Sequence, residues 1–174
     1  TVPKGGVTAL CGLSGCGKST IASLMMKFSD PDQGRILLEG RDYRAFTPQE
    51  LRRHIAMVPQ TVTVFSGTIR ENLLIADANA TDEQLMKVLE DAALADFVRG
   101  EPEGLDTDVG DAGSRLSGGQ KQKIGIARAL LSVAEYIIFD EATSSVDVDS
   151  EREIWNCIHR LARTRTLIII SHRL

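Results

Sequence analysis

Three kinds of feature are missing from this sequence, and each absence narrows what the chain can be. The three cysteines, Cys11, Cys16 and Cys157, show neither metal-ligand spacing nor an even disulfide framework, which favours a reducing, cytosolic setting. No apolar run approaches the length of a membrane span, and no signal peptide is visible. The net charge is −4 with acids and bases interspersed, which argues against a nucleic-acid partner.

What is present is typical of a soluble globular domain. The 174 residues suffice for one core with at most a small insertion, and 43% hydrophobic with 25% charged residues is an ordinary composition. The chain starts at Thr1 without a methionine and stops two residues after His172. We therefore expect it to be the excised core of a longer polypeptide.

The stretch Gly12–Thr20 reads Gly-Leu-Ser-Gly-Cys-Gly-Lys-Ser-Thr and matches the phosphate-binding pattern G-x-x-x-x-G-K-[ST]. An apolar run at Val7–Cys11, which predicts a buried strand, precedes it. The segment Ile21–Phe28 follows, and its apolar residues are spaced for a helix packed on a sheet. These residues are Ile21, Leu24, Met25 and Phe28. Strand, glycine-rich turn and helix form the context that this motif requires.

Such a loop wraps closely around an anion, because its glycines let successive N–H groups and a helix N-terminus point inward. We expect Lys18 to reach the β- and γ-phosphates and the hydroxyl of Ser19 to ligate Mg²⁺. The predicted phosphate-binding residues are Gly12, Ser14, Gly15, Cys16, Gly17, Lys18, Ser19 and Thr20.

Cys16 has two interpretations of equal weight. Among inward-pointing amides its thiolate would be stabilised, so that a thiol alkylator would inactivate the protein and MgATP would protect it. Alternatively, Cys16 merely fills a variable position of the loop.

Alternating strands and helices predict an α/β doubly wound fold with a mostly parallel sheet. Three more apolar runs, at 55–58, 136–139 and 166–170, are expected to be strands. Polar residues follow them, namely Gln60, Asp140, Glu141 and His172. Ligands bind at the carboxyl ends of parallel strands, so we expect these side chains beside the glycine-rich loop. Asp140 is then the expected Mg²⁺ partner, and Glu141 could orient or deprotonate a water.

Capping patterns mark four helix starts. They are Thr47-x-x-Glu50, Thr81-x-x-Gln84, Ser117-x-x-Gln120 and Ser150-x-x-Glu153. Gly118 and Gly119 are unfavourable in the first turn of the third helix. They are explained if a phosphate approaches the backbone N–H groups there; the alternative is a helix start that is simply weakened. Residues 100–113 predict a long loop, and Trp155 is expected in the core rather than as a base-stacking platform.

With these residues in place, the sequence resembles the nucleotide-binding domain of an ABC transporter ATPase over essentially its whole length. Leu116–Gln120 is the LSGGQ signature letter for letter, which is far more specific than a P-loop alone. In the family's order, the other matches are the Walker A loop, the Q-loop Gln60, the Walker B Asp140, the catalytic Glu141, the D-loop Asp147 and the switch His172. Segments 64–72 and 108–113 are similar to the exporter-type subfamily, although exporters usually carry Glu where Asp111 stands.

The resemblance implies a P-loop NTPase fold with a RecA-like ATP-binding core at 1–71 and 135–174 and an inserted α-helical subdomain at 72–134. It implies ATP and Mg²⁺ as ligands, with Ser19, Gln60 and Asp140 at the metal. It implies hydrolysis by four catalytic residues, which are Lys18, Gln60, Glu141 and His172.

The resemblance also implies two domains that sandwich two ATP molecules head to tail. Each ATP would meet one signature turn and one D-loop of the second copy, through Ser117, Gly118, Gly119, Gln120 and Asp147. The other implied partner is a transmembrane domain in the same full-length chain, at the cytoplasmic face of the membrane. The family's adenine-stacking aromatic upstream of the P-loop and its strands after the switch histidine are not in this sequence. Two alternatives are a soluble ABC-type ATPase of translation or DNA repair and a catalytically silent regulatory cassette.

Overall fold

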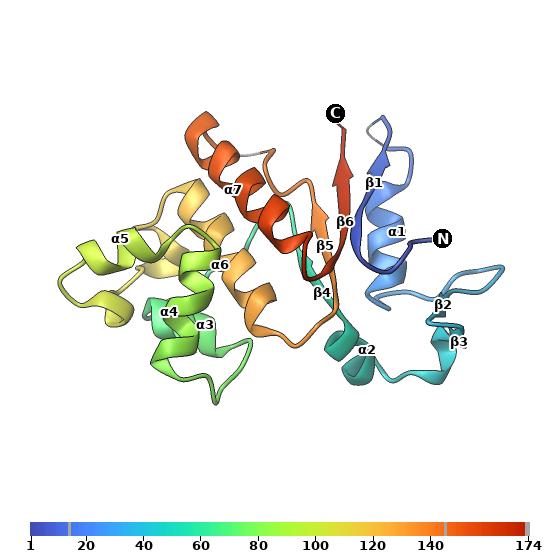
Figure 1. Cartoon of the computed structure of the whole chain (residues 1–174), viewed down its shortest axis with the longest axis horizontal. Coiled ribbons are helices and arrows are strands. Elements are labelled where there is room, and N and C mark those ends of the chain that lie inside the picture. Colours follow the sequence, from blue (N-terminus) through green and yellow to red (C-terminus); the bar gives the residue numbers. More distant parts are fainter. Residues whose placement is uncertain (14, 145, 173–174) are drawn as a thin grey trace.

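The computed structural model describes residues 1–13, 15–144 and 146–172, so the predicted phosphate ligand Ser14 lies outside the described residues. Its central sheet has four parallel strands in the order β1-β6-β5-β4. They are β1 (Gly6–Cys11), β4 (Ile55–Val58), β5 (Tyr136–Asp140) and β6 (Thr166–Ser171). Their carboxyl ends meet at one edge of the sheet (Figure 1), as the predicted parallel α/β fold requires.

Seven helices and a small hairpin surround this sheet in the described part of the chain. The helices are α1 (Lys18–Met25), α2 (Pro48–His54), α3 (Ile69–Leu74), α4 (Asp82–Asp91), α5 (Ala95–Gly100), α6 (Gly118–Leu131) and α7 (Val148–Leu161). The hairpin joins β2 (Leu37–Leu38) to β3 (Arg41–Asp42), and 3-10 turns lie at Tyr43–Ala45, Gly104–Asp106 and Asp111–Gly113. Among the described helices, none has the length and apolar character to cross a membrane.

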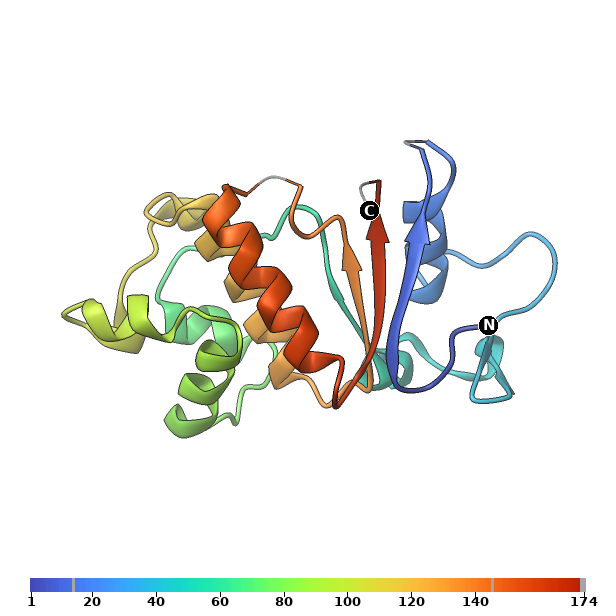
Figure 2. The ribbon, with the colours of Figure 1, turned by 45° about the horizontal axis from the view of Figure 1, so that its top comes forward.

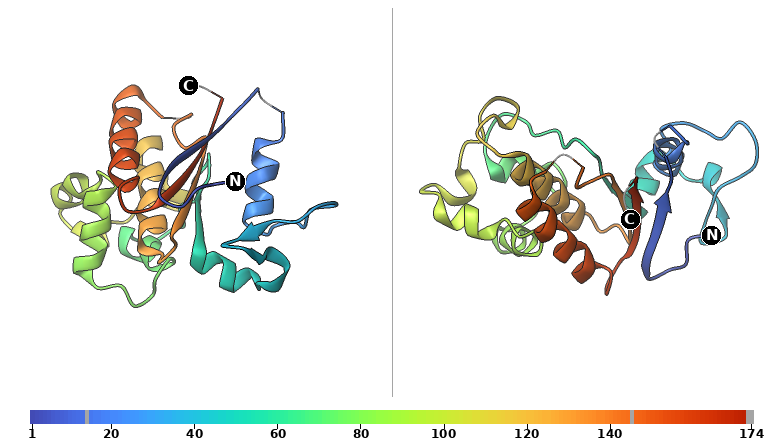
Figure 3. Two further views of the ribbon diagram at one scale, coloured as in Figure 1. Left: turned by 45° about the vertical axis from the view of Figure 1, so that its right-hand side comes forward. Right: turned by 90° about the horizontal axis from the view of Figure 1, so that it is seen from above.

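Alternating side chains of the strands divide the core into two clusters, one on each face of the sheet. Tyr136 and Ile138 of β5 pack on the face covered by α1 and α2. Ile137 and Phe139 pack on the opposite face with α6 and α7. Figures 2 and 3 show the two helical layers on either side of the sheet, with α3, α4 and α5 outside α6. The larger cluster therefore continues from the sheet into the helical segment.

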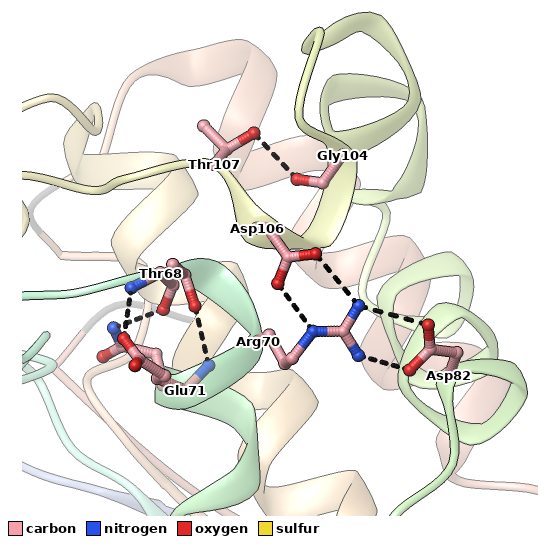
Figure 4. Close-up of polar contacts among 8 residues, drawn as sticks. Thr68, Arg70, Glu71, Asp82, Gly104, Asp106 and Thr107 are labelled. Atoms are coloured by element: carbon pink, nitrogen blue, oxygen red, sulfur yellow. Dashed lines mark hydrogen bonds and ion pairs between the residues drawn. The ribbon is translucent and has the colours of Figure 1, made fainter.

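A single arginine joins the outer helices to the predicted long loop. Arg70 in α3 forms ion pairs with Asp82 of α4 and with Asp106 of the 3-10 turn at 104–106 (Figure 4). Nearby, the N–H of Ile69 donates to the carbonyl of Thr107 at 3.1 Å. Residues 100–113 therefore form an ordered connection with two short 3-10 turns, held against the start of α3.

Three of the four predicted helix caps are confirmed. Full capping boxes begin α2, α4 and α6 at Thr47, Thr81 and Ser117. The fourth prediction is wrong, because Asp147 rather than Ser150 caps α7, and its carboxylate accepts the N–H of Ser150 at 2.9 Å. Both residue types are good caps, and the helix begins at the earlier one.

Two expected core segments are more exposed than predicted. β1 has β6 as its one neighbour among the described strands, and its alternate residues, starting with Val7 at 50% exposure, face outward. The first helix begins at Lys18 and ends at Met25, so Phe28 lies beyond it and is 62% exposed. Lys18 and Ala22 are its buried residues and Met26 is buried just beyond its end, whereas Ile21 is turned outward at 41% exposure.

Candidate active site

The glycine-rich loop between β1 and α1 closes on its own lysine. The ammonium of Lys18 donates to the carbonyl oxygens of Gly12 at 2.7 Å and Leu13 at 3.0 Å, and the side chain is buried. Gly17, with a left-handed φ of 95°, begins α1, and no described side chain caps the helix there. The first N–H groups of α1 and a buried ammonium therefore share one small loop, which is the chemistry of an anion site.

Close packing inside this loop involves Cys16. A Cβ on Gly12 would lie 2.6 Å from the Sγ of Cys16, so a larger residue at Gly12 would displace the thiol. The same sulfur lies 3.9 Å from the ammonium of Lys18. Cys16, Ser19 and Thr20 are all exposed, so the thiol and the two hydroxyls lie where a ligand can reach them.

Asp140 at the end of β5 is the group best placed for a cation. Its Oδ1 is buried and has no hydrogen-bond partner among residues 1–13, 15–144 and 146–172. Burial raises the pKa of Asp140, the charge of Glu141 adds to that rise, and Lys18 opposes it. The described chain contains no cluster of three His, Cys, Asp or Glu side chains that could hold a metal ion. One carboxylate beside a phosphate-binding loop fits Mg²⁺, which takes one or two carboxylates and completes its octahedron with water and phosphate.

Glu141 and His172 meet at the same edge of the sheet. Glu141 has a left-handed φ of 49°, which is uncommon for a residue with a side chain, and its N–H donates to the carbonyl of Ile170 at 2.9 Å. Its Oε1 lies 3.3 Å from the Nδ1 of His172. The backbone of β6 thus fixes the main chain of Glu141 in the turn after β5, and the carboxylate lies beside the residue that follows β6.

A cavity of about 280 Å³ opens beside this pair. Its lining residues are Glu141, Thr143, Ser144, Glu151, Trp155, Ser171 and His172. Trp155 packs against the larger core cluster, as predicted, but it is only partly buried and also faces this cavity. A helical position on the inward face of α7 predicts the packing, whereas the cavity arises from the turn after β5 and could not be read from helical spacing.

Gln60 has a partner that the sequence does not predict. Its Nε2 donates to the Oγ of Ser144 at 3.0 Å, although the two residues are 84 positions apart. Ser144 lies in the connection between Glu141 and Asp147, three residues from each of these motif acids, and this position is the signal that could have drawn attention to it.

The predicted signature residues form a second group at the start of α6. Ser117 caps the helix and Gln120 completes its capping box. A Cβ on Gly119 would lie 2.6 Å from the Cβ of Ser150 and nearer still to its hydroxyl, so Gly119 permits close contact with α7. This packing explains one of the two glycines without a phosphate. The same Cβ would lie 3.5 Å from the Oδ2 of Asp147, a carboxylate whose pKa is lowered by the N–H of Ser150.

The two groups lie at opposite ends of one face of the molecule. Figure 2 shows the glycine-rich loop after β1 at one end of the strand-end edge and the first turns of α6 and α7 at the other, with β6 and β5 between them. The structure thus brings Lys18, Asp140, Glu141, His172 and Gln60 to one edge, and it places the signature turn with Asp147 beyond them.

A phosphate-binding loop and a buried aspartate at the carboxyl edge of a parallel sheet define a P-loop nucleotide-binding fold. The family model described as "ABC transporter" matches residues 1–144. The chain is 47% identical over 175 residues to an ATP-dependent lipid A-core flippase of Pseudomonas fluorescens, covering 100% of this chain and 29% of that protein. It is 44% identical over 174 residues to the beta-(1→2)glucan export ATP-binding/permease protein NdvA of Agrobacterium vitis, covering 100% of this chain and 30% of that one.

A solved structure gives the same result. The structure of a bacterial Atm1-family ABC exporter with ATP bound superposes with a TM-score of 0.89 at 40% identity, covering 98% of this chain and 30% of the other. The chain belongs to the ABC transporter family and is an ATP-binding domain of it, as the sequence predicted. It spans about 30% of the length of these two relatives.

Proposed function

We propose that this chain is the ATP-hydrolysing domain of an exporter-type ABC transporter and that ATP joins it head to tail to a second nucleotide-binding domain. One observation carries the proposal. The signature turn at Ser117–Gln120 lies at the far end of the face that holds the chain's own glycine-rich loop (Figure 2). Two copies that face each other in opposite directions would each complete the other's site.

Binding of ATP is assigned to the loop Gly12–Thr20. The ammonium of Lys18 already bonds two carbonyl oxygens, and phosphate oxygens would replace them as charge-assisted partners. Ser19, Asp140 and Gln60 would hold Mg²⁺, with the buried Oδ1 of Asp140 as the strongest support. When bound, the metal neutralises charge that develops on the phosphates.

Hydrolysis is assigned to Glu141 and His172. Glu141 would orient and polarise the attacking water, since its backbone N–H is held by the carbonyl of Ile170 in the turn after Asp140. His172, with its Nδ1 3.3 Å from that carboxylate, would steady this geometry and contact the γ-phosphate. Gln60 donates a hydrogen bond to Ser144, and it would give up this bond when it binds the metal.

In the second copy, the residues expected at the γ-phosphate are the first turn of α6 and Asp147. An S-x-x-Q cap leaves backbone N–H groups of Gly118 and Gly119 at a helix start, which suits an anion.

The remaining partner is a membrane domain. We place the ATP-binding domain described here at the cytoplasmic face of that membrane. The relatives named above are a flippase and an export ATP-binding/permease protein. This favours an exporter over a soluble ABC-type ATPase. We propose 1–71 and 135–174 as the ATP-binding core and 72–134 as the helical subdomain, since the six strands of the described chain lie in the former ranges.

The test is Glu141→Gln. We expect ATP binding to remain, phosphate release to fall by at least about a hundredfold, and ATP-dependent dimers to accumulate, because a neutral amide cannot polarise the water. Radiolabelled phosphate release and light scattering with and without MgATP measure these effects. Phosphate release at the wild-type rate would overturn the role of Glu141. Absence of ATP-dependent association in both proteins would overturn the head-to-tail dimer.

A further inference from the structure

Two consecutive polar residues lie in the buried middle of the signature helix. Gln122 and Lys123 of α6 are only 4% and 7% exposed. Buried polar groups are retained at a cost in desolvation unless they are hydrogen-bonded, so each of these residues needs a partner. Each has one, and the two partners lie on different segments of the chain.

Gln122 ties α6 to the segment that carries Gln60. Its Nε2 donates to the carbonyl oxygen of Pro59 at 3.0 Å, one residue before Gln60. One turn further along α6, a Cβ on Gly125 would lie 2.5 Å from a methyl group of Val62. Helix and segment are therefore in direct contact on both sides of Gln60.

Lys123 ties α6 to α7. Its ammonium forms an ion pair with Glu153, whose side chain is 48% exposed, whereas that of Lys123 is 9% exposed. One turn earlier in α6, Gly119 packs closely against Ser150. Residues four apart on α6 thus meet residues three apart on α7, so the two contacts lie in one row along the helix pair.

We propose that Gln122 and Lys123 are positioning residues that set the signature turn at a defined place relative to Gln60 on one side and Asp147 on the other. The proposal rests on the proposed function, because the signature turn serves the second copy's ATP. A displacement of about 1 Å in a catalytic arrangement can cost about a hundredfold in rate, so such anchors matter beyond their contribution to folding.

If Lys123 only stabilised the fold, its replacement would lower the melting temperature and nothing else; the positioning role predicts a different result. A buried ion pair is often neutral for stability when apolar side chains of similar volume replace it. In Lys123→Met the stem is conserved and the remaining Glu153 is half-exposed, so we expect the melting temperature to stay near that of the wild type. The positioning role predicts that the signature turn becomes less ordered although the protein folds normally.

The experiment compares Lys123→Met with Lys87→Met, which breaks the exposed pair between Lys87 and Asp91 in α4. Without nucleotide, we expect amide hydrogen exchange at Gln120 and Lys121, whose N–H groups donate to Ser117, to rise by at least about tenfold in Lys123→Met and not in Lys87→Met. In the Glu141→Gln background, we expect the ATP concentration for half-maximal association to rise by about tenfold, equivalent to 1.4 kcal/mol. Binding of a fluorescent ATP analogue to the monomer should not change, because Lys18, Ser19 and Asp140 are untouched.

A charge-restoring variant completes the design. Lys123→Arg should return both exchange and association toward the wild type. Unchanged exchange at Gln120 and Lys121 in a folded Lys123→Met protein would overturn the proposal, as would equal effects of Lys123→Met and Lys87→Met. The exchange measurement needs no dimer, so it judges the positioning role even if the parent protein fails to associate and the proposed function falls.

Discussion

At the scale of single residues, the thiol of Cys16 gives a direct test of the ligand's position. We expect a maleimide to modify Cys16 and abolish most ATP binding, because an adduct there would fill the space above Gly12 and beside Lys18. MgATP should protect the thiol by covering it. Cys157 should not react, since burial raises its pKa to about 11.

Peptide mapping by mass spectrometry identifies the modified cysteine, and Cys16→Ala is the matched control. This variant should keep ATP binding after treatment, although exposed Cys11 will still be labelled. Equal labelling of Cys16 with and without MgATP would mean that it fills a variable position away from the ligand.

The place of the candidate site residues at the sheet edge could be predicted, whereas their hydrogen-bond and ion-pair partners could not. Asp140 and Glu141 follow an apolar strand, so their place at the sheet edge is a consequence of local pattern. The bond between Gln60 and Ser144 joins segments 84 positions apart, and no local pattern encodes such a pairing. The same is true of Lys123 and Glu153, which no pattern in the sequence singles out as a pair.

At the scale of elements, the close contact between α6 and α7 predicts that replacing a helical glycine with alanine destabilises the protein, the reverse of what helix propensity alone predicts. Alanine is the better helix former by about 1 kcal/mol, yet Gly119→Ala should lower the free energy of unfolding by roughly 1–3 kcal/mol through overpacking against Ser150. Chemical denaturation measures the change.

Gly100→Ala in the last turn of α5 is the control, because a Cβ there meets nothing within 4 Å. It should be neutral or slightly stabilising. Ser150→Gly should relieve the effect of Gly119→Ala, since it removes the crowding side chain. Equal stability of the two alanine variants would contradict the close packing.

Element boundaries could be predicted where a single capping pattern was present. Thr47, Thr81 and Ser117 each mark a helix start correctly. At α7 two good caps lie three residues apart, and sequence alone does not rank Asp147 above Ser150. The exposed face of β1 also escaped prediction, because an apolar run does not reveal whether a strand has neighbours on one side or two.

At the scale of the whole molecule, the site is split across one face. The strand-end residues and the signature turn lie in a single chain but at opposite ends (Figure 2). The resemblance to the family predicted this separation of the two groups. Composition and residue spacing alone predict a ligand, but they do not predict how two domains assemble. The physical reason is that the second copy that we propose would contribute no pattern to the sequence of this chain.

Whole-molecule stability should reveal the cost of keeping Asp140 charged. Its folded-state pKa is raised by burial, so above that pKa the ionised carboxylate destabilises the folded chain. As pH falls through the folded-state pKa, the folded protein takes up the proton first and the penalty decreases. The penalty is gone once the unfolded chain is also protonated, below about pH 3.9. Asp140→Asn should therefore raise the free energy of unfolding at pH 7, with a smaller gain at acid pH, while weakening MgATP binding.

Asp147→Asn is the opposite case and serves as the control for that experiment. Its pKa is lowered by the N–H of Ser150, so the ionised form is favoured in the folded state above the unfolded pKa, and that stability is lost as pH falls. We expect Asp147→Asn to lower the melting temperature slightly at pH 7, in the direction opposite to Asp140→Asn. Thermal melts of both variants between pH 4 and pH 8 distinguish the two signs. A lower melting temperature for Asp140→Asn at pH 7 would show that its carboxylate is satisfied in the folded chain and would remove the main support for a cation at that oxygen.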